Sequence, residues 1–304
     1  MWMDIAIMLE GQNGLNWPRF QRIARAVEEL GFAGLFRSDH FTNASPPDID
    51  SLELWVSLTW LASHTQRIAF GSLVSPVSFR DPVFTARMAK DVDDLSGGRL
   101  VLGVGAGWQE REHTNFGYDL LDVKGRMARF EEGLEVITRL LRSDAPVSFS
   151  GDFYRLHEAI LLPRPARPGG PPLLIGGNGE RRTLPLAARY ADEWNGVFVP
   201  AARYAELNGK LSALVAQAGR DPAQVRRSLM TNILFGRDDA EVSAKLAGRS
   251  ASDLRARGIV VGTPDAVQDQ LAAIAAAGAQ RVMLQWLDLD DLGGLAALAE
   301  AVLR

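Results

Sequence analysis

Short apolar segments alternate along the chain with longer segments in which apolar residues recur every three or four positions. The short segments are typical of buried β-strands, and the longer ones of amphipathic helices. Eight segments are expected to be strands: Asp4–Leu9, Ala33–Arg37, Ile68–Gly71, Leu100–Val104, Leu173–Gly176, Glu193–Val197, Arg227–Phe235 and Arg281–Trp286. This alternation predicts βα units arranged around a parallel sheet.

Helices are expected between these strands. The first runs from about Trp17 to Leu30, with Pro18 in its first turn and Gly31 just past its end, the positions that these residue types favour. Further helical patterns cover Val83–Leu95, Met127–Leu141, Thr183–Tyr190, Arg203–Ala218 and Pro264–Ala277. Eight strands with at least as many helices predict an α/β fold, a closed (β/α)₈ TIM barrel, with residues 1–304 in a single domain.

A doubly wound open sheet would also alternate strands and helices. That fold carries a Gly-x-Gly-x-x-Gly loop after its first strand. Here Leu9 is followed by Glu-Gly-Gln-Asn-Gly, which lacks this spacing, and the run Gly103–Gly107 follows a strand in the middle of the chain. The barrel is therefore favoured.

Residues 144–172 interrupt the alternation, between the fourth and fifth strands. Val147–Leu156 has the pattern of a β-hairpin that turns at Ser150-Gly151-Asp152, and a proline-rich run follows. An insertion of this kind is expected to lie over a rim of the barrel.

Composition excludes several classes of function. The chain has no cysteine, a net charge of −4 and no basic block, so disulfides, thiolate metal sites and nucleic-acid binding are not expected. The four histidines lack a metal-ligand spacing, and no metal is predicted. Met1–Leu9 is typical of a strand rather than a signal peptide, and no uncharged run approaches transmembrane length. We expect a cytoplasmic enzyme with a small-molecule substrate and no membrane partner.

Residues that directly follow barrel strands line the active mouth. The second strand runs into Ser38, Asp39 and His40. An isolated Asp-His pair is more often a loop cap beside a packed histidine. At the end of a barrel strand, however, the pair favours proton transfer by His40, with Asp39 orienting it or contacting a cofactor.

Two glycine-rich segments follow later strands. Gly105-Ala106-Gly107 could let the backbone approach a flat ring, or could only relieve crowding, and its spacing does not decide between the two. Residues 176–181 (Gly-Gly-Asn-Gly-Glu-Arg) lead directly into a predicted helix, where free N–H groups and the helix dipole favour a phosphate. The alternative is a plain helix start with solvated arginines. We favour a phosphate of a mononucleotide-like cofactor.

Several segments resemble the bacterial luciferase-like monooxygenase superfamily. They are Leu30–His40, Arg67–Gly71, Asp94–Trp108, Ala191–Asn195 and Gly262–Pro264, in order along nearly the whole chain. Within the superfamily, Phe36–His40, Gly176–Leu184 and Leu284–Asp288 resemble the branch that uses coenzyme F420, a deazaflavin. The resemblance implies a cofactor at the barrel mouth, F420 or alternatively FMN, and a non-proline cis peptide bond at Leu73–Val74.

The resemblance also implies a set of site residues. Those expected to contact the cofactor are Ser38, Asp39, Leu73, Val74, Gly105, Ala106, Gly107, Gly176, Gly177, Asn178, Gly179, Glu180 and Arg181. Those expected in the substrate pocket are Gln12, Trp108, Glu112 and Trp286. Sugar-phosphate and secondary-alcohol dehydrogenases of this branch carry a tryptophan at the position of Ala44 and a glutamate at that of Trp108. These two departures argue against a sugar phosphate as substrate.

Three functions remain open on this reading. The favoured one is hydride transfer between F420 and a small organic substrate. The alternative is an FMN-dependent monooxygenase that receives reduced flavin from a separate reductase and activates O₂. The third is a flavin-binding protein without catalysis. A homodimer is expected through apolar residues at 52–61 together with Phe84 and Met88.

Overall fold

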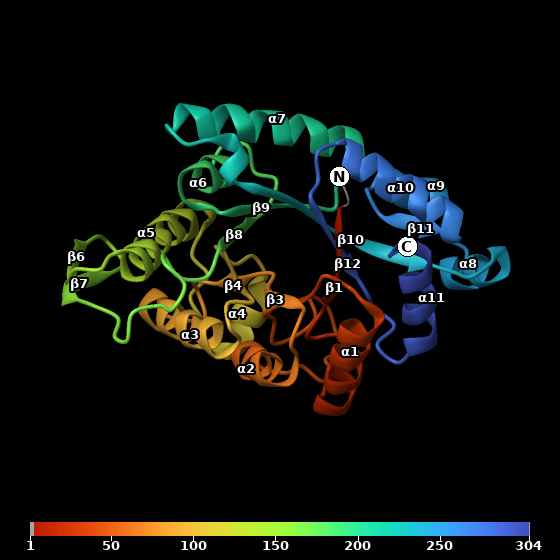
Figure 1. Ribbon diagram of the computed structural model, residues 1–304, viewed down its shortest axis with the longest axis horizontal. Coiled ribbons are helices and arrows are strands. Elements are labelled where there is room, and N and C mark those ends of the chain that lie inside the picture. Colours follow the sequence, from red (N-terminus) through yellow and green to blue (C-terminus); the bar gives the residue numbers. More distant parts are fainter. Residues whose placement is uncertain (1–2, 304) are drawn as a thin grey trace.

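Eight parallel strands close into a barrel in the computed structural model, which describes residues 3–303; Met1, Trp2 and Arg304 lie outside the described part (Figure 1). The barrel strands are β1 (Asp4–Leu9), β2 (Gly34–Arg37), β3 (Ala69–Ser72), β5 (Leu100–Gly105), β8 (Leu173–Gly176), β9 (Glu193–Val197), β10 (Arg226–Phe235) and β12 (Arg281–Gln285). They pair in this order, and β12 pairs with β1 to close the ring. The predicted barrel is confirmed.

Two short strands were not predicted. β4 (Ser75–Pro76) pairs with the end of β5, and β11 (Val260–Gly262) pairs with the end of β10. Segments of two and three residues are too short to carry a recognisable alternation of apolar and polar positions.

Helices surround the barrel, as Figure 1 shows. They are α1 (Trp17–Leu30), α2 (Leu54–His64), α3 (Pro82–Leu95), α4 (Glu110–Phe116), α5 (Val123–Arg142), α6 (Thr183–Tyr190), α7 (Ala201–Gln217), α8 (Asp239–Leu246), α9 (Ala251–Ala256), α10 (Pro264–Ala276) and α11 (Leu292–Val302). α5 begins four residues before the predicted start at Met127, because the side chain of Asp122 accepts a hydrogen bond from the N–H of Gly125 and caps the helix there. Within residues 3–303, no helix is both long enough and apolar enough to cross a bilayer.

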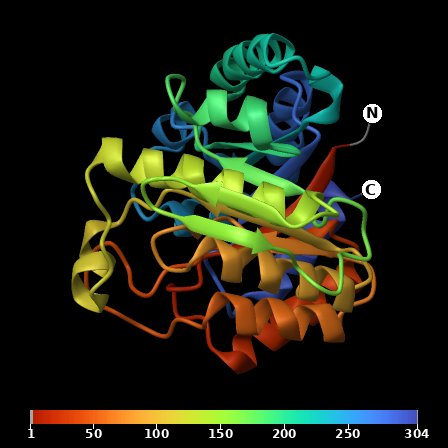
Figure 2. The same ribbon diagram turned by 90° about the vertical axis from the view of Figure 1, so that its left-hand side faces the viewer.

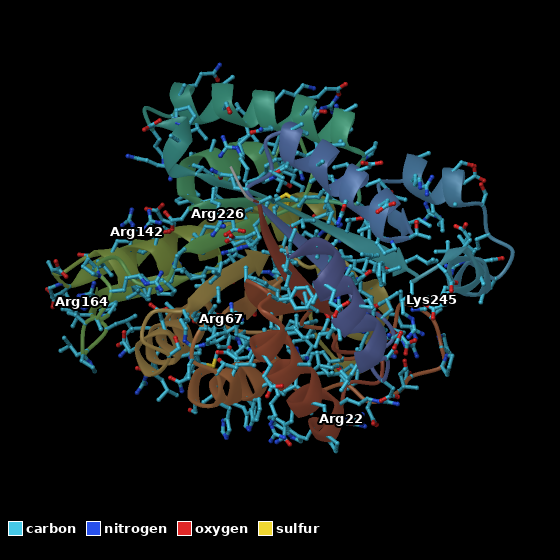
Figure 3. All side chains as sticks on the ribbon, turned by 45° about the vertical axis from the view of Figure 1, so that its right-hand side comes forward. Arg22, Arg67, Arg142, Arg164, Arg226 and Lys245 are labelled. Carbon is cyan, nitrogen blue, oxygen red and sulfur yellow. The ribbon has the colours of Figure 1, made fainter. Side chains whose placement is uncertain are left out.

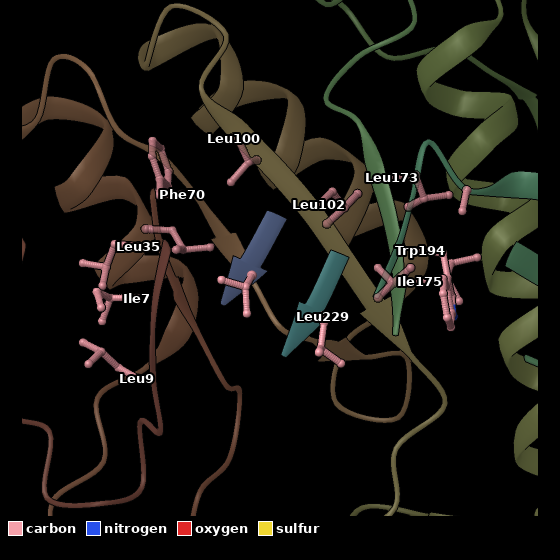
Figure 4. Packing of buried hydrophobic residues seen from close by; sticks show 14 of the residues in the cluster. Ile7, Leu9, Leu35, Phe70, Leu100, Leu102, Leu173, Ile175, Trp194 and Leu229 are labelled. Atoms are coloured by element: carbon pink, nitrogen blue, oxygen red, sulfur yellow. The ribbon is translucent and has the colours of Figure 1, made fainter. Parts of the chain in front are cut away.

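Alternate residues of each strand face two separate apolar layers, as the two-residue period of a strand requires. Ile7 and Leu9 of β1 belong to the layer between strands and helices, which Figure 4 shows in part. Ala6 and Met8 belong to a smaller cluster that also contains Phe36, Leu73, Val101, Leu174, Met230 and Met283. This inner cluster fills the barrel below its mouth.

The insertion forms an antiparallel hairpin of β6 (Val147–Ser150) and β7 (Arg155–Ala159), as predicted. It lies along the outer side of α5 (Figure 2). The carboxylate of Glu132 on α5 accepts hydrogen bonds from the N–H groups of Asp152, Phe153 and Tyr154 at the hairpin turn. None of residues 144–172 lines the cavity at the mouth of the barrel.

Charged groups close the opposite end of the barrel, where the strands begin. Arg281 donates to the carboxylate of Glu193 at 2.8 Å, and both side chains are buried. Arg226 pairs with Asp4 (Figure 3). Arg99 donates to four backbone carbonyls and to Oγ1 of Thr65. At this end of the barrel the arginines are held by protein acceptors.

Candidate active site at the barrel mouth

A cavity of about 480 Å³ opens where the barrel strands end. Of the residues expected at the site, those that line it are Ser38, Asp39, His40, Leu73, Val74, Gly105, Ala106, Gly107, Trp108, Glu112, Gly176, Gly177 and Asn178. Others that sequence reasoning missed are Met8, Glu10, Pro76, Val123, Arg126, Met127, Phe130, Thr183, Asn195, Val197, Phe198 and Met230. The missed residues of α5 follow a helical spacing, because one face of that helix forms a wall.

Five expected site residues do not line this cavity. Glu180 turns outward to Lys210, at 2.6 Å, and to Arg203. Gly179 is absent from the cavity lining, and Arg181 lines a separate pocket between α5 and α6. Gln12 lies behind the wall and hydrogen-bonds to Glu10 and Ser38. Trp286 lines a separate cavity of about 410 Å³ between β10, α8 and α9.

The floor of the cavity is built around Val74. The Leu73–Val74 bond is cis, as the family resemblance implied. A Cβ atom added at Gly105 would lie 2.5 Å from Cγ2 of Val74, and one at Gly103 would lie 2.0 Å from the carbonyl oxygen of Ser72. These glycines therefore make room for the segment after β3. Of the two roles considered for the glycine-rich segment, this is the relief of crowding. Leu73 and Val74 themselves present the apolar surface to a bound molecule.

His40 is paired with Glu112 from α4. The imidazole Nδ1 lies 2.8 Å from Oε1 of Glu112, while Oε2 accepts a hydrogen bond from the N–H of Phe41 at 3.0 Å. Glu112 is buried, and both residues line the cavity. With Nδ1–H donated to the carboxylate, Nε2 is the ring atom available to a bound molecule. Glu112 thus fixes the orientation and the tautomer of His40.

The same pairing sets the charge of His40. Burial of the imidazole disfavours its charged form, but the hydrogen bond and the negative charge of Glu112 outweigh this, and the pKa of His40 lies above its ordinary value. For Glu112 too, burial opposes ionisation, and the bonds from His40 and Phe41 overcome it, so the pKa of Glu112 is lowered. The pairing therefore favours the protonated ring of His40 beside the ionised carboxylate of Glu112.

Asp39 has a different partner from the one expected. Its carboxylate pairs with Arg80 and accepts a hydrogen bond from Oγ of Ser75 at 3.1 Å. Arg80 in turn donates to Glu53 at the start of α2, at 2.6 Å. Asp39 is therefore anchored to neighbouring loops, and Glu112 takes the orienting role next to His40.

Glu10, at the end of β1, adds a third carboxylate to the cavity. Gln285 donates to one of its oxygens, and Gln12 donates to the other at 2.8 Å. Gln12 accepts from the hydroxyl of Ser38 at 2.9 Å, which links β1 to the end of β2. The sequence signal for Glu10 was its position directly after the first strand.

The opposite side of the cavity offers hydrogen-bond donors. Thr183 and Arg126 line it there, at the starts of α6 and α5. The backbone N–H groups of residues 179–182 donate to no protein acceptor within residues 3–303, whereas the N–H of Gly177 is occupied by the carbonyl of Asn195. Free N–H groups at a helix start attract an anion. The N–H of Gly177 is therefore not available to a phosphate, whereas the N–H groups of residues 179–182 are.

Two asparagines complete the wall between β8 and β9. The amide of Asn178 donates to the carbonyl of Val197 at 2.7 Å and accepts from its N–H at 3.0 Å. Asn195 is buried and donates to Ser228 at 2.9 Å, but its Oδ1 has no partner in the described residues. An unpartnered carbonyl at the cavity wall fits a bound molecule that carries an N–H group.

Fold and site together define a (β/α)₈-barrel enzyme with an acid–base pair at its mouth. The model for luciferase-like monooxygenases matches residues 3–257, and the chain belongs to this family of oxidoreductases. It is 34% identical to 4-hydroxyprotoasukamycin monooxygenase of Streptomyces nodosus subsp. asukaensis over 58% of this chain and 46% of that one. It is 29% identical to the F420-dependent hydroxymycolic acid dehydrogenase of Mycobacterium tuberculosis over 92% of this chain and 74% of that one.

A solved structure with this fold is an F420-dependent secondary alcohol dehydrogenase in complex with an F420-acetone adduct. The TM-score is 0.87 at 20% identity, with 99% of this chain and 98% of that one covered. The chain spans about half the length of several curated relatives that it matches, between 46% and 52% in six cases. F420-dependent dehydrogenases are among the curated relatives, and another solved structure with this fold is a type II Baeyer-Villiger monooxygenase component in complex with FMN.

Proposed function

We propose that the protein transfers a hydride between coenzyme F420 and a small organic alcohol or carbonyl compound. The observation that carries this proposal is the His40–Glu112 pair facing the cavity, with Nε2 of His40 left for substrate. Reduction of a carbonyl needs one proton at its oxygen, and oxidation of an alcohol releases one. A histidine held by a buried carboxylate performs both steps. A relative that aligns over most of the chain is an F420-dependent dehydrogenase.

The residues present fit a deazaflavin. The free N–H groups of residues 179–182, with Thr183, would hold its phosphate, and Leu73 and Val74 would support its ring. Oδ1 of Asn195 would accept a hydrogen bond from a ring N–H. When bound, the cofactor supplies the carbon that donates or accepts hydride, so the protein has to bind, orient and manage one proton.

The chain's own contribution is proton management. In the direction of carbonyl reduction, Nε2 of His40 gives its proton to the oxygen of the substrate, and the carboxylate of Glu112 stabilises the charged ring beforehand. In the direction of alcohol oxidation, neutral His40 accepts the proton. The raised pKa of His40 favours the acid form of the ring, which is the form that carbonyl reduction requires.

The deciding measurement is cofactor affinity. Purified protein is titrated with F420 and, separately, with FMN, and binding is followed by cofactor fluorescence and by calorimetry. We expect F420 to bind at least about tenfold more tightly, a difference of about 1.4 kcal/mol. Tighter binding of FMN, together with substrate-dependent O₂ consumption when a flavin reductase is added, would replace this proposal with the flavin monooxygenase. Tight binding without turnover of any alcohol or carbonyl would leave a storage protein.

A homodimer is part of the proposal. Leu54, Trp55, Leu58 and Leu61 of α2 are buried within the protein itself. Val56 of α2 and Phe84 of α3 stay exposed on neighbouring helices and remain available to a second copy. Light scattering should give twice the mass of the chain, and a monomer mass independent of dilution would contradict this expectation.

A further inference from the structure

We infer that the mouth selects an uncharged substrate with an apolar body, such as a medium-chain ketone or secondary alcohol, and that Trp108 and Phe198 are the residues that select it. This inference rests on the proposed hydride transfer and names its substrate class. It is carried by the charges of the cavity, by the aromatic side chains at its rim and by the backbone conformation of Phe198.

The charges of the cavity disfavour an anionic substrate. Three carboxylates line it, those of Glu10, Asp39 and Glu112. Besides His40, Arg126 is the one basic side chain among the described lining residues. Arg126 belongs to α5, on the same side as Thr183, where the cofactor phosphate is proposed to bind. Arg80 pairs with Asp39 and His40 pairs with Glu112, whereas Glu10 has no cationic partner within residues 3–303. An anionic substrate would meet the like charge of Glu10 and find no free cation in the cavity beyond Arg126.

The rim of the same cavity is apolar and exposed. Trp108 is 61% exposed, Val123 56% and Phe198 40%, and all three line the cavity. They come from the end of β5, the start of α5 and the end of β9, so they stand on different elements around the opening. The ring of Trp108 meets His40 edge-on, with 5.6 Å between centroids. A large apolar side chain kept in water beside the acid–base residue is suited to contact the body of a substrate.

Phe198 is presented by an unusual backbone. Its φ is +49°, in the left-handed region that a bulky residue rarely adopts. Its N–H donates to the carbonyl of Met230 at 3.0 Å, and the preceding Val197 is held by the amide of Asn178. Neighbouring hydrogen bonds thus impose a conformation that glycine would adopt more easily. The conformation places an aromatic ring at the mouth.

The test uses reduced F420 with three ketones: acetone, 2-heptanone and 6-oxoheptanoate, which is a 2-heptanone that ends in a carboxylate. The carbonyl carbon gains hydride from the reduced cofactor, its oxygen gains a proton from His40, and the cofactor is oxidised. We expect kcat/KM for 2-heptanone to exceed that for acetone by at least about tenfold, since each buried methylene can contribute roughly a factor of four. The value for 6-oxoheptanoate should lie below that for 2-heptanone. Equal values for acetone and 2-heptanone, or a preference for the charged ketone, would overturn the inference.

Variants assign the selectivity to residues. Trp108→Ala and Phe198→Gly should each reduce the ratio of kcat/KM for 2-heptanone to that for acetone to about threefold or less. Phe198→Gly also suits the positive φ, so a folding defect is not expected. The matched control is Phe153→Ala, because Phe153 is 38% exposed but lies on the hairpin away from the mouth. A control that lowers the ratio as much as the mouth variants would refute the assignment.

A binding measurement separates the two proposals. Calorimetric binding of 2-heptanol to the protein, without turnover, should weaken at least about fivefold in Phe198→Gly. Failure of F420 to bind would overturn the proposed function, whereas F420 binding with no discrimination between acetone and 2-heptanone would overturn only the substrate class. Unchanged affinity for 2-heptanol in both mouth variants would also overturn the role of the two aromatic residues.

Discussion

The two ends of the barrel use charged and polar groups in opposite ways. Where the strands begin, Arg281 and Glu193 are buried against each other, and Arg99 donates to carbonyls and a hydroxyl. Where the strands end, the backbone N–H groups of residues 179–182 and Oδ1 of Asn195 have no protein partner within residues 3–303. The first end pairs its charged groups with one another, although Oε1 of Glu193 and Nε of Arg281 accept or donate no hydrogen bond within the same residues, and the second leaves a row of backbone N–H groups for a ligand.

This difference separates stability from function along one axis of the molecule. Removing one member of a charged pair at the closed end leaves the other charge buried without a partner, which lowers the free energy of unfolding. Removing an N–H donor or a carbonyl acceptor that has no protein partner at the mouth costs little stability, because no protein hydrogen bond is lost. Each variant below is therefore expected to change one property and spare the other.

The largest expected effect is at the mouth. His40→Ala should lower kcat by about 10²- to 10⁴-fold while cofactor affinity stays nearly intact, because the ring manages the substrate proton and leaves binding to other residues. Steady-state kinetics and a fluorescence titration measure the two quantities. Unchanged turnover would remove His40 from the mechanism, and a parallel loss of cofactor affinity would make it a binding residue.

At the closed end, Arg281→Ala should destabilise the fold by about 3–5 kcal/mol, because it leaves the carboxylate of Glu193 buried and unpaired. Turnover per folded molecule should remain close to that of the natural protein. The double variant Arg281→Met with Glu193→Leu should recover much of the loss, since no charge is then buried. Chemical denaturation measures this, and a double variant less stable than Arg281→Ala would contradict the account.

Glu112→Gln should change the pH dependence. The carboxylate of Glu112 raises the pKa of His40, so its removal lowers that pKa. Carbonyl reduction needs the protonated ring, and the limb of the pH–kcat/KM profile that reports His40 should move to lower pH. At neutral pH the rate should fall by about tenfold, and at low pH the two enzymes should converge. A rate lowered equally at every pH would show that Glu112 acts other than through the charge of His40.

The smallest effect is expected at Glu180, which the sequence suggested as a cofactor contact. Its side chain pairs with Lys210 and Arg203 on the surface. Glu180→Ala should change cofactor affinity by less than about twofold, because exposed ion pairs contribute little and the backbone N–H is retained. A fluorescence titration decides this. A tenfold loss would return the Glu180 side chain to the cofactor site.

The barrel could be predicted from local pattern because each of its strands is an apolar run bounded by turn residues. Side-chain pairs whose members lie far apart in the sequence could not be predicted in this way. Glu112 is 72 positions from His40, and Arg80 is 41 from Asp39, so only the folded chain brings each pair together. Sequence showed the glycines at 103 and 105 but not the segment after β3 that lies against them.

One misplaced residue could have been placed correctly from the sequence. Met283 and Gln285 of β12 face the barrel interior and the mouth, where Met283 belongs to the inner cluster and Gln285 binds Glu10. Side chains alternate along a strand, so the next residue, Trp286, must face the other way. It does so and lines the second cavity. The two-residue period contained this information.

The amide of Asn178 has a mechanical consequence. It pairs with both backbone groups of Val197, as the peptide group of one more β8 residue would, and so adds a rung to the ladder between β8 and β9 beyond Gly176 and Asn195. The pairing between β8 and β9 thereby extends above the level of the cavity floor. Parting the two strands at this level would break both hydrogen bonds of the Asn178 amide, so we expect a bound molecule to enter and leave along the barrel axis. The same two hydrogen bonds connect the segment before α6 to the end of β9, so we expect the start of α6 and the end of β9 to move together.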